Sequence, residues 1–206
     1  MIKLWGRNNS VNVQKVIWCL EELKVPYERI DAGMQYGVVN EPQFRKMNPN
    51  GLVPVIEDGG MVMYESNAIV RYLGAKYGKD RIWPEDPAER AQADKWMDWN
   101  ATVYWPAMRP VFWGLARTAP EKRNLEEIEA GRKKCAEVLK MADAQLAITP
   151  YIAGDQFTMG DIPIGTTSWR WFGLPLERPP LPHLEAWFKR LGERPAFKHH
   201  VMLPLT

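Results

Sequence analysis

The chain has 206 residues and a formal net charge of +2, with 46% hydrophobic and 25% charged residues. This balance is typical of a globular chain and excludes disordered and fibrous proteins. The charge is too small to indicate nucleic acid or a membrane surface as a partner. No apolar run approaches the ~20 residues of a membrane-spanning helix. The length suits two compact domains or one large one.

The cysteines and the first residues bear on the cellular compartment. Only Cys19 and Cys135 occur, and no CxxC pair is present. This usage fits a reducing compartment and argues against a disulfide scaffold or a zinc site, so we expect no metal. Both thiols are expected on or near buried helix faces, where cysteines are usually inert. The opening stretch MIKLWGRNNS lacks the apolar core of a signal peptide, which predicts a cytoplasmic protein.

The N-terminal part of the chain mixes strand and helix patterns. Apolar and polar residues alternate in IKLW and YERID, which predicts two strands. Between them, an apolar stripe from Val13 to Leu23 predicts a helix that stops before Pro26. The long segment after YERID predicts at most a short helix. Two short strands around Asp58-Gly59-Gly60 predict a hairpin, and a helix follows that Ser66 can cap and Gly78 can end.

After GKDRIWPEDP, which has the composition of a linker, the pattern becomes wholly helical. Asp86 is a predicted helix cap, because a proline and then an acidic residue follow it in the first turn. Pro106 and Pro110 are expected to break or kink the long segment that comes next.

The remaining helices are predicted from caps and apolar seams. Thr118 with Glu121, and Thr158 with Asp161, have the spacing of a capping box. A seam of apolar residues that begins at Leu125 predicts a helix to residue 146. The stretch HLEAWFKRLGERPAF predicts a short amphipathic helix.

These patterns divide the chain into two units. The βαβ and ββα order predicts an α/β domain over residues 1–79, and the helical patterns predict an all-helical domain over residues 87–206. The fold class expected is therefore α/β plus all-α.

Three short stretches carry residues that suit a binding site. Ser10 and Asn12 stand where the first helix begins, in WGRNNSVNVQKV. Small polar residues at this position commonly cap the helix. Alternatively, their side chains and the free N–H groups of the helix N-terminus bind an anion such as a thiolate or a carboxylate.

The second stretch is Val53-Pro54, and the third is Glu65-Ser66. An X–Pro bond is usually trans, but a cis bond here would turn the Val53 N–H and C=O outward, where they can pair with an extended peptide. Glu65 can be a plain surface acid and Ser66 a plain cap. Together they also offer an acceptor for an ammonium group and a helix N-terminus for a carboxylate, which are the two needs of a free α-amino acid.

Taken in order, these features resemble the cytosolic glutathione transferase family over nearly the whole chain. The stretches that carry the resemblance are MNPNGLVPVIEDGG, MYESNAIVRYL, YIAGDQFTMGDI and RPAF. They look like the family's segment around a cis-proline, its Glu/Gln-Ser pair, its C-terminal capping box with a staple, and its closing segment. The resemblance implies a thioredoxin-like N-terminal domain followed by a helical domain.

The family's catalytic group lies in the loop before the first helix. It is tyrosine in some classes, serine in the theta and delta classes, and cysteine in the beta and omega classes. No tyrosine or cysteine stands in this loop. Ser10 stands where the serine classes have theirs, and Ser10 with Asn12 matches the Thr-x-Asn spacing of the bacterial Nu class. The resemblance implies Ser10 and Asn12 as the catalytic candidates and leaves both open.

The resemblance also implies a binding site for glutathione as co-substrate. Glu65 and Ser66 would bind the γ-glutamyl head, and the Val53 backbone, shaped by Pro54, would pair with the cysteinyl backbone. Asn50 or nearby loop residues would reach the glycyl end. The chain departs from some serine-class members, because it has Gly51 at a position where they carry a histidine.

The function implied is that of a glutathione transferase in detoxification, with the glutathione thiolate attacking a small, apolar electrophile between the domains. The wall of that pocket is expected to come from Trp105, Arg109 and Trp113. A homodimer is also implied. The alternatives are a glutathione-dependent disulfide reductase or peroxidase on the same fold, and a non-catalytic glutathione-binding scaffold.

Overall fold

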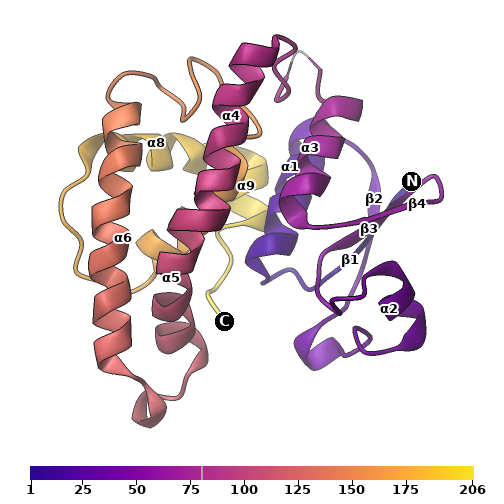
Figure 1. Cartoon of the computed structure of the whole chain (residues 1–206), viewed down its shortest axis with the longest axis horizontal. Helices are drawn as coiled ribbons and strands as arrows, with labels where there is room; N and C mark the ends of the chain where they lie inside the picture. The colour runs from indigo at the N-terminus through magenta and orange to yellow at the C-terminus, as the bar shows by residue number, and fades with distance from the viewer. Residues whose placement is uncertain (80) are drawn as a thin grey trace.

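The structure is a computed structural model that describes residues 1–79 and 81–206. Asp80, in the predicted linker, lies outside the described residues. A small α/β domain, drawn in indigo and purple, stands beside a helical domain drawn from magenta to yellow (Figure 1). The expected combination of an α/β domain with an all-helical one is confirmed. No helix among the described residues is long and apolar enough to cross a membrane.

The N-terminal domain is built on a mixed four-stranded sheet. The strands are β1 (Ile2–Trp5), β2 (Tyr27–Ile30), β3 (Val55–Asp58) and β4 (Met61–Tyr64). Their spatial order is β2-β1-β3-β4, with β1 parallel to β2 and the other two pairs antiparallel. The predicted hairpin is confirmed, since Gly59 and Gly60 form its turn with positive φ angles of 58° and 88°.

Helices cover both faces of this sheet (Figure 1). They are α1 (Val11–Leu23), the short η1 (Met34–Tyr36), α2 (Pro42–Met47) and α3 (Ser66–Tyr77). Side chains alternate along each strand. Ile2 and Leu4 therefore join the core under α1 and α3, whereas Trp5 packs with Phe44 of α2 and Val55 on the other face.

The helical domain surrounds a core rich in large side chains, among them the fully buried Trp171 and Trp187. Its longer helices are α4 (Pro87–Trp99), α5 (Trp105–Phe112), α6 (Leu125–Leu146), α7 (Asp161–Gly173), α8 (Pro182–Gly192) and α9 (Pro195–His200). The short turns η2 (Asn100–Tyr104), η3 (Trp113–Arg117) and η4 (Pro120–Lys122) lie between them. The last amphipathic segment is thus divided into α8 and α9.

The two prolines of α5 do not end the helical path from α4 to residue 117. Wide π turns, η2 and η3, stand directly before and after α5. Pro106 lies in the first turn of α5, where a missing N–H is tolerated, and Pro110 lies inside the helix. Locally altered turns are a common way for a helix to accommodate such residues.

Three predicted caps have different outcomes. Asp86 caps α4 as expected, because its side chain accepts from the backbone N–H groups of Ala88 and Glu89. The predicted capping box at Thr118 is wrong. Asn124 caps α6 instead and accepts from the Glu127 N–H at 3.1 Å. The prediction for Ser66 is also wrong, since α3 already begins at this residue and its hydroxyl points elsewhere.

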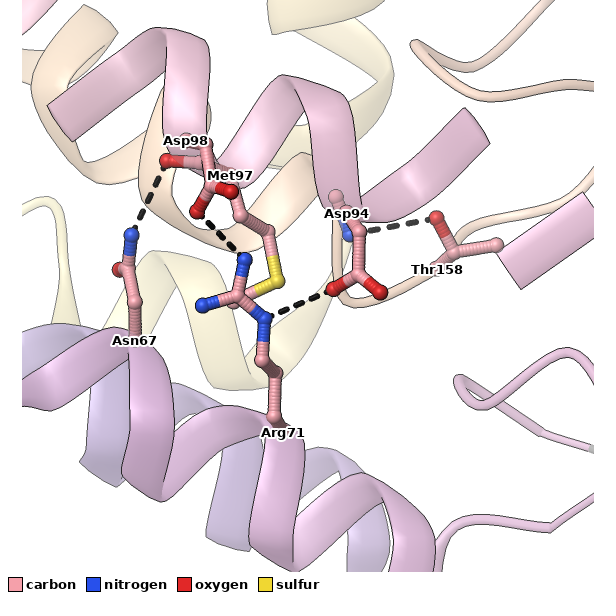
Figure 2. A network of polar contacts seen from close by, with 7 residues as sticks. Asn67, Arg71, Asp94, Met97, Asp98 and Thr158 are labelled. Carbon is pink, nitrogen blue, oxygen red and sulfur yellow. Dashed lines mark hydrogen bonds and ion pairs between the residues drawn. The ribbon is translucent and has the colours of Figure 1, made fainter. Parts of the chain in front are cut away.

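The two domains are joined by polar contacts between α3 and α4 (Figure 2). The Arg71 guanidinium donates to Asp94 at 2.7 Å and to Asp98 at 2.5 Å. One turn earlier on α3, the Asn67 amide donates to the Met97 carbonyl at 3.0 Å. A planar guanidinium that bridges two carboxylates of α4 links the two helices.

Asp161, at the start of α7, is the buried polar centre of the helical domain. Its carboxylate accepts from the Ile152 N–H at 3.0 Å, the Thr158 N–H at 2.9 Å and the Trp187 indole at 2.8 Å. The predicted pairing of Thr158 with Asp161 is confirmed. Burial raises the pKa of this carboxyl to about 6, although the three donors oppose the shift.

Replacing Asp161 by alanine is expected to lower the free energy of unfolding by about 3 kcal/mol or more. Each buried donor left without a partner costs about 1–3 kcal/mol. Urea unfolding followed by circular dichroism measures the loss. Asp155→Ala, in the exposed loop before α7, is the matched control and should change stability by less than about 0.5 kcal/mol. Equal stability of the two variants would contradict the role of Asp161.

Candidate active site

A cavity of about 460 Å³ lies between the two domains. Its N-terminal wall comes from the loop before α1, the loop before β3 and the start of α3, and its other wall comes from α5 and η3. It brings together nine of the residues singled out in the sequence: Ser10, Asn12, Val53, Pro54, Glu65, Ser66, Trp105, Arg109 and Trp113. Asn50 is exposed and is not among the lining residues, whereas the neighbouring Gly51 is.

Ser10 is the N-cap residue of α1, yet its side chain makes no capping hydrogen bond. Its carbonyl accepts from the Gln14 N–H at 2.9 Å, as an N-cap carbonyl does. The hydroxyl has no partner within residues 1–79 and 81–206, and it borders the cavity. The capping interpretation therefore accounts for the backbone of Ser10 but not for its hydroxyl.

Asn12 is held by two donors behind the cavity wall. Its side-chain oxygen accepts from the Lys15 ammonium at 3.0 Å and from the Ser66 hydroxyl at 3.3 Å. Because Oδ1 accepts these two hydrogen bonds, the Nδ2 amide group is the part of the side chain that is available to a ligand. This amide has no partner in the described part of the chain. Asn12 thus offers the cavity a second hydrogen-bond donor, two residues after Ser10.

Lys15 is a buried charged residue behind Asn12 that the sequence analysis did not single out. Its side chain is buried, and its ammonium also lies 3.5 Å from the Ser66 hydroxyl. Burial, and to a smaller extent Arg170, lower the pKa of Lys15 to about 7, although Glu65 opposes the shift. The signal that could have found it is the spacing Asn12-x-x-Lys15, which places both side chains on one helix face.

The Val53–Pro54 peptide bond is cis. Neither the N–H nor the C=O of Val53 has a hydrogen-bond partner in the described part of the chain. Both residues line the cavity, so this strand end has a donor and an acceptor free for an extended ligand.

Glu65, the residue before α3, has an unusual backbone. Its φ angle is +71° and its ψ angle is +105°, a conformation that costs a residue with a side chain about 1–3 kcal/mol. Both Glu65 and Ser66 border the cavity. The carboxylate of Glu65 thus stands beside the first turn of α3, where N–H groups are free.

Positive charge dominates the cavity. Arg7, Arg109 and Arg117 line it, and Glu65 is the one acidic residue of its lining in the described ranges. Burial and the nearby Arg117 lower the pKa of Arg7, and burial lowers that of Arg117. Arg7 and Arg117 are 110 positions apart, so no local pattern could have brought them together.

Neither cysteine belongs to the cavity lining. Cys19 and Cys135 are free and fully buried, as expected. Burial raises the pKa of both thiols, that of Cys135 to about 12. Both are therefore protonated at neutral pH and unsuited as nucleophiles.

Comparison with known proteins identifies the family. The N-terminal domain model of glutathione S-transferases matches residues 4–81, and the C-terminal domain model of the same family matches residues 103–195. The chain is 46% identical to the glutathione S-transferase GstB of Escherichia coli strain K12, over the full length of both proteins. The chain belongs to the glutathione S-transferase family.

Other relatives of this transferase extend the comparison. It is 31% identical to glutathione S-transferase 3 of Zea mays, with 97% of this chain and 93% of the relative covered. It is also similar to the crystal structure of a theta class glutathione S-transferase from Xanthomonas axonopodis pv. citri with glutathione bound. That match has a TM-score of 0.97 and 48% identity and covers 100% and 99% of the two chains. The fold and the enzyme class predicted from the sequence are confirmed.

The buried Lys15 makes the stability of this transferase depend on pH. Its pKa falls from ~10.4 in an unfolded chain to about 7 in the fold. Between these values the unfolded state binds more protons, so stability rises with pH, with a slope of at most ~1.4 kcal/mol per pH unit. We expect Lys15 to make the free energy of unfolding of the parent protein rise with pH above about pH 7. Lys15→Met should lack this contribution.

Urea unfolding of both proteins over a pH series measures this difference. Lys46→Met is the matched control, because Lys46 is exposed on α2, and it should follow the parent curve. Parallel curves for the parent and Lys15→Met would contradict the buried, pH-sensitive state of Lys15.

Proposed function

We propose that this transferase binds glutathione in the cavity, ionises its thiol at the N-terminus of α1, and transfers the sulfur to an electrophile. The observation that carries the proposal is the pair of donors at the cavity wall, the Ser10 hydroxyl and the Asn12 amide, neither of which the rest of the described chain uses. The relative from Xanthomonas, whose structure has glutathione bound, supports the choice of ligand.

The proposed pose of glutathione follows the free groups of the N-terminal wall. Glu65 binds the ammonium of the γ-glutamyl head. The carboxylate of that head accepts from the free N–H groups in the first turn of α3, at Ser66. The cysteinyl backbone pairs with the N–H and C=O of Val53 beside Pro54. The glycyl end extends toward Asn50. The Asn50 N–H is bound to the Asn48 side chain at 3.0 Å, which shapes this loop.

The free energies involved are sufficient for ionisation. Lowering a thiol pKa from ~8.5 by about 2 units requires about 2.7 kcal/mol. A helix N-terminus contributes about 0.3–1 kcal/mol, which is too little alone. One hydrogen bond to the thiolate adds about 1.5–3 kcal/mol. The donors at Ser10 and Asn12 therefore supply the difference, and the surrounding arginines act in the same direction. The proton leaves to solvent.

The second substrate is proposed to bind against α5 and η3. Trp105, Arg109 and Trp113 line that side of the cavity. Trp113 is partly exposed and stacks with the Arg109 guanidinium at 5.5 Å from its ring centroid. Flat indole surfaces suit an aromatic or otherwise apolar electrophile. We assign glutathione binding to residues 1–79 and this second pocket to residues 87–206.

The same proposal extends to the setting of the enzyme. The family resemblance implies a role in detoxification by conjugation, a cytoplasmic location and a homodimer. The two free, buried thiols are consistent with a reducing compartment. A mixed-disulfide mechanism with a protein thiol is not favoured, because both cysteines lie outside the cavity lining. The free donors and backbone groups at the cavity favour catalysis over a scaffold role.

Ser10→Ala and Asn12→Ala are each expected to raise the thiol pKa of bound glutathione by about 1 unit, because each removes a hydrogen bond to the thiolate. The rate of conjugation to 1-chloro-2,4-dinitrobenzene near neutral pH should fall about tenfold. The ultraviolet absorbance of the thiolate, titrated against pH, measures the pKa directly.

Asn8→Ala is the matched control, because Asn8 is an exposed residue of the same loop. It should leave both the pKa and the rate unchanged. If the double variant Ser10→Ala/Asn12→Ala also retains the pKa and rate of the parent, the proposed ionisation at the start of α1 is wrong.

Glu65→Gln is expected to weaken the binding of glutathione by about tenfold or more, because it removes a charge partner of the ammonium group. Isothermal titration calorimetry measures the dissociation constant. Cysteinylglycine, which lacks the γ-glutamyl head, provides the comparison and should bind the parent and the variant equally. Loss of affinity for both ligands alike would point to misfolding of the Glu65 turn rather than to the proposed contact.

A further inference from the structure

The cavity carries more positive charge than the proposed transfer of sulfur requires. Arg7 comes from the loop after β1, Arg109 from α5 and Arg117 from the end of η3. None of the three forms an ion pair with a carboxylate side chain within the described ranges. Arginines that remain without a carboxylate in a cavity are suited to bind an anion.

Arg117 is fixed in place. Its guanidinium donates twice to the main-chain oxygen of Thr206, at 3.2 and 3.0 Å, and lies 5.0 Å from the ring centroids of Phe112 and Trp113. Behind Phe112, the fully buried Arg170 lies 5.5 Å from the same ring and adds to the positive potential. This end of the cavity is therefore positive before any ligand enters.

Arg7 and Arg109 have unused donors. Arg7 makes no side-chain hydrogen bond within residues 1–79 and 81–206, and its buried Nε lacks a partner. Gly33 packs against it so closely that a Cβ there would lie 3.1 Å from its Nη1. Arg109 is exposed and stacks on Trp113, also without a hydrogen bond or ion pair among the described residues. Both side chains border the same cavity, so each has donors available for an anion that binds there.

We propose that the preferred electrophile is an aromatic compound that carries a carboxylate, with its ring against Trp105 and Trp113 and its carboxylate held by Arg109 and Arg7. This inference rests on the proposed function and names the substrate class of the same site. In the reaction, the glutathione sulfur forms a bond to a ring carbon and the bond from that carbon to chlorine breaks. Chloride leaves, the thiol proton goes to solvent, and the carboxylate is unchanged.

The test uses two electrophiles of nearly the same shape, the anionic 4-chloro-3-nitrobenzoate and the neutral 4-chloro-3-nitrobenzamide. For each, kcat/KM is divided by the rate constant of the uncatalysed reaction with glutathione, which corrects for their different reactivity. We expect this enhancement to be at least tenfold larger for the benzoate. The preference should decrease with added salt, since salt screens exposed charges.

Arg109→Gln should lower the enhancement for the benzoate about tenfold and that for the benzamide less than twofold. Arg109→Lys should lie between, because it keeps the charge but loses the bidentate geometry. Arg7→Gln should act in the same direction. Lys122→Gln, on the exposed η4 turn, is the matched control and should leave both rates as in the parent. The KM for glutathione should stay constant in all four variants.

Equal enhancement of the two compounds by the parent protein would overturn the inference. It would also fail if Arg109→Gln slowed both electrophiles alike or raised the KM for glutathione, because the arginine would then act on glutathione. Turnover of neither compound, with an ionised thiol in bound glutathione, would overturn the electrophile class while the proposed function stands. An unionised thiol would instead overturn the proposed function.

Discussion

The burial of α1 between the two domains is the constraint on which the rest of the site depends. This helix packs on the sheet and α3 on one side and on α7 and α9 on the other. Trp18, in its middle, is fully buried and packs against the tilted rings of Phe157 and Phe197. A Cβ at Gly165 of α7 would lie 2.8 Å from the Trp18 ring, so only a glycine allows this close approach.

Because α1 is enclosed, its polar residues have few possible arrangements. Glu22, near its end, is paired with Arg194 at 2.6 Å and accepts from the Trp18 indole at 2.9 Å. At its beginning, Lys15 is buried and directs its ammonium to Asn12 and Ser66. Because the side-chain oxygen of Asn12 is already bound, the start of α1 holds its remaining donors in fixed positions toward the ligand. Catalysis depends on donors that are held in place before the substrate binds.

The two walls of the cavity have different electrostatic characters. The N-terminal wall combines one acid, Glu65, with free backbone groups at Val53, a mixture suited to the zwitterionic ends of a peptide. The wall from α5 and η3 combines indole rings with arginines and carries no acidic lining residue in the described ranges. The first wall therefore suits glutathione, and the second suits a compound that is both flat and anionic.

Much of this could be predicted from the sequence, because it depends on local patterns. The structure has the alternation of apolar and polar residues in IKLW, the apolar stripe of α1 and the cap at Asp86. Each of these is a property of residues that are neighbours in the sequence. The predicted cap at Thr118 failed because Asn124, six residues on, has a similar spacing to Glu127 and stands at the true start of α6. Spacing alone does not choose between two such caps.

The sequence by itself determined the family, the order of the elements and the short stretches from which the site is built. The tertiary structure decided what the side chains of those stretches do. It alone showed that the Ser10 hydroxyl does not cap α1, that Ser66 turns to Asn12 rather than to its own helix, and that Lys15 is buried. It also gathered Arg7, Arg109 and Arg117 around one cavity. The physical reason is that burial and electrostatic neighbours depend on contacts between distant segments, which no local pattern contains.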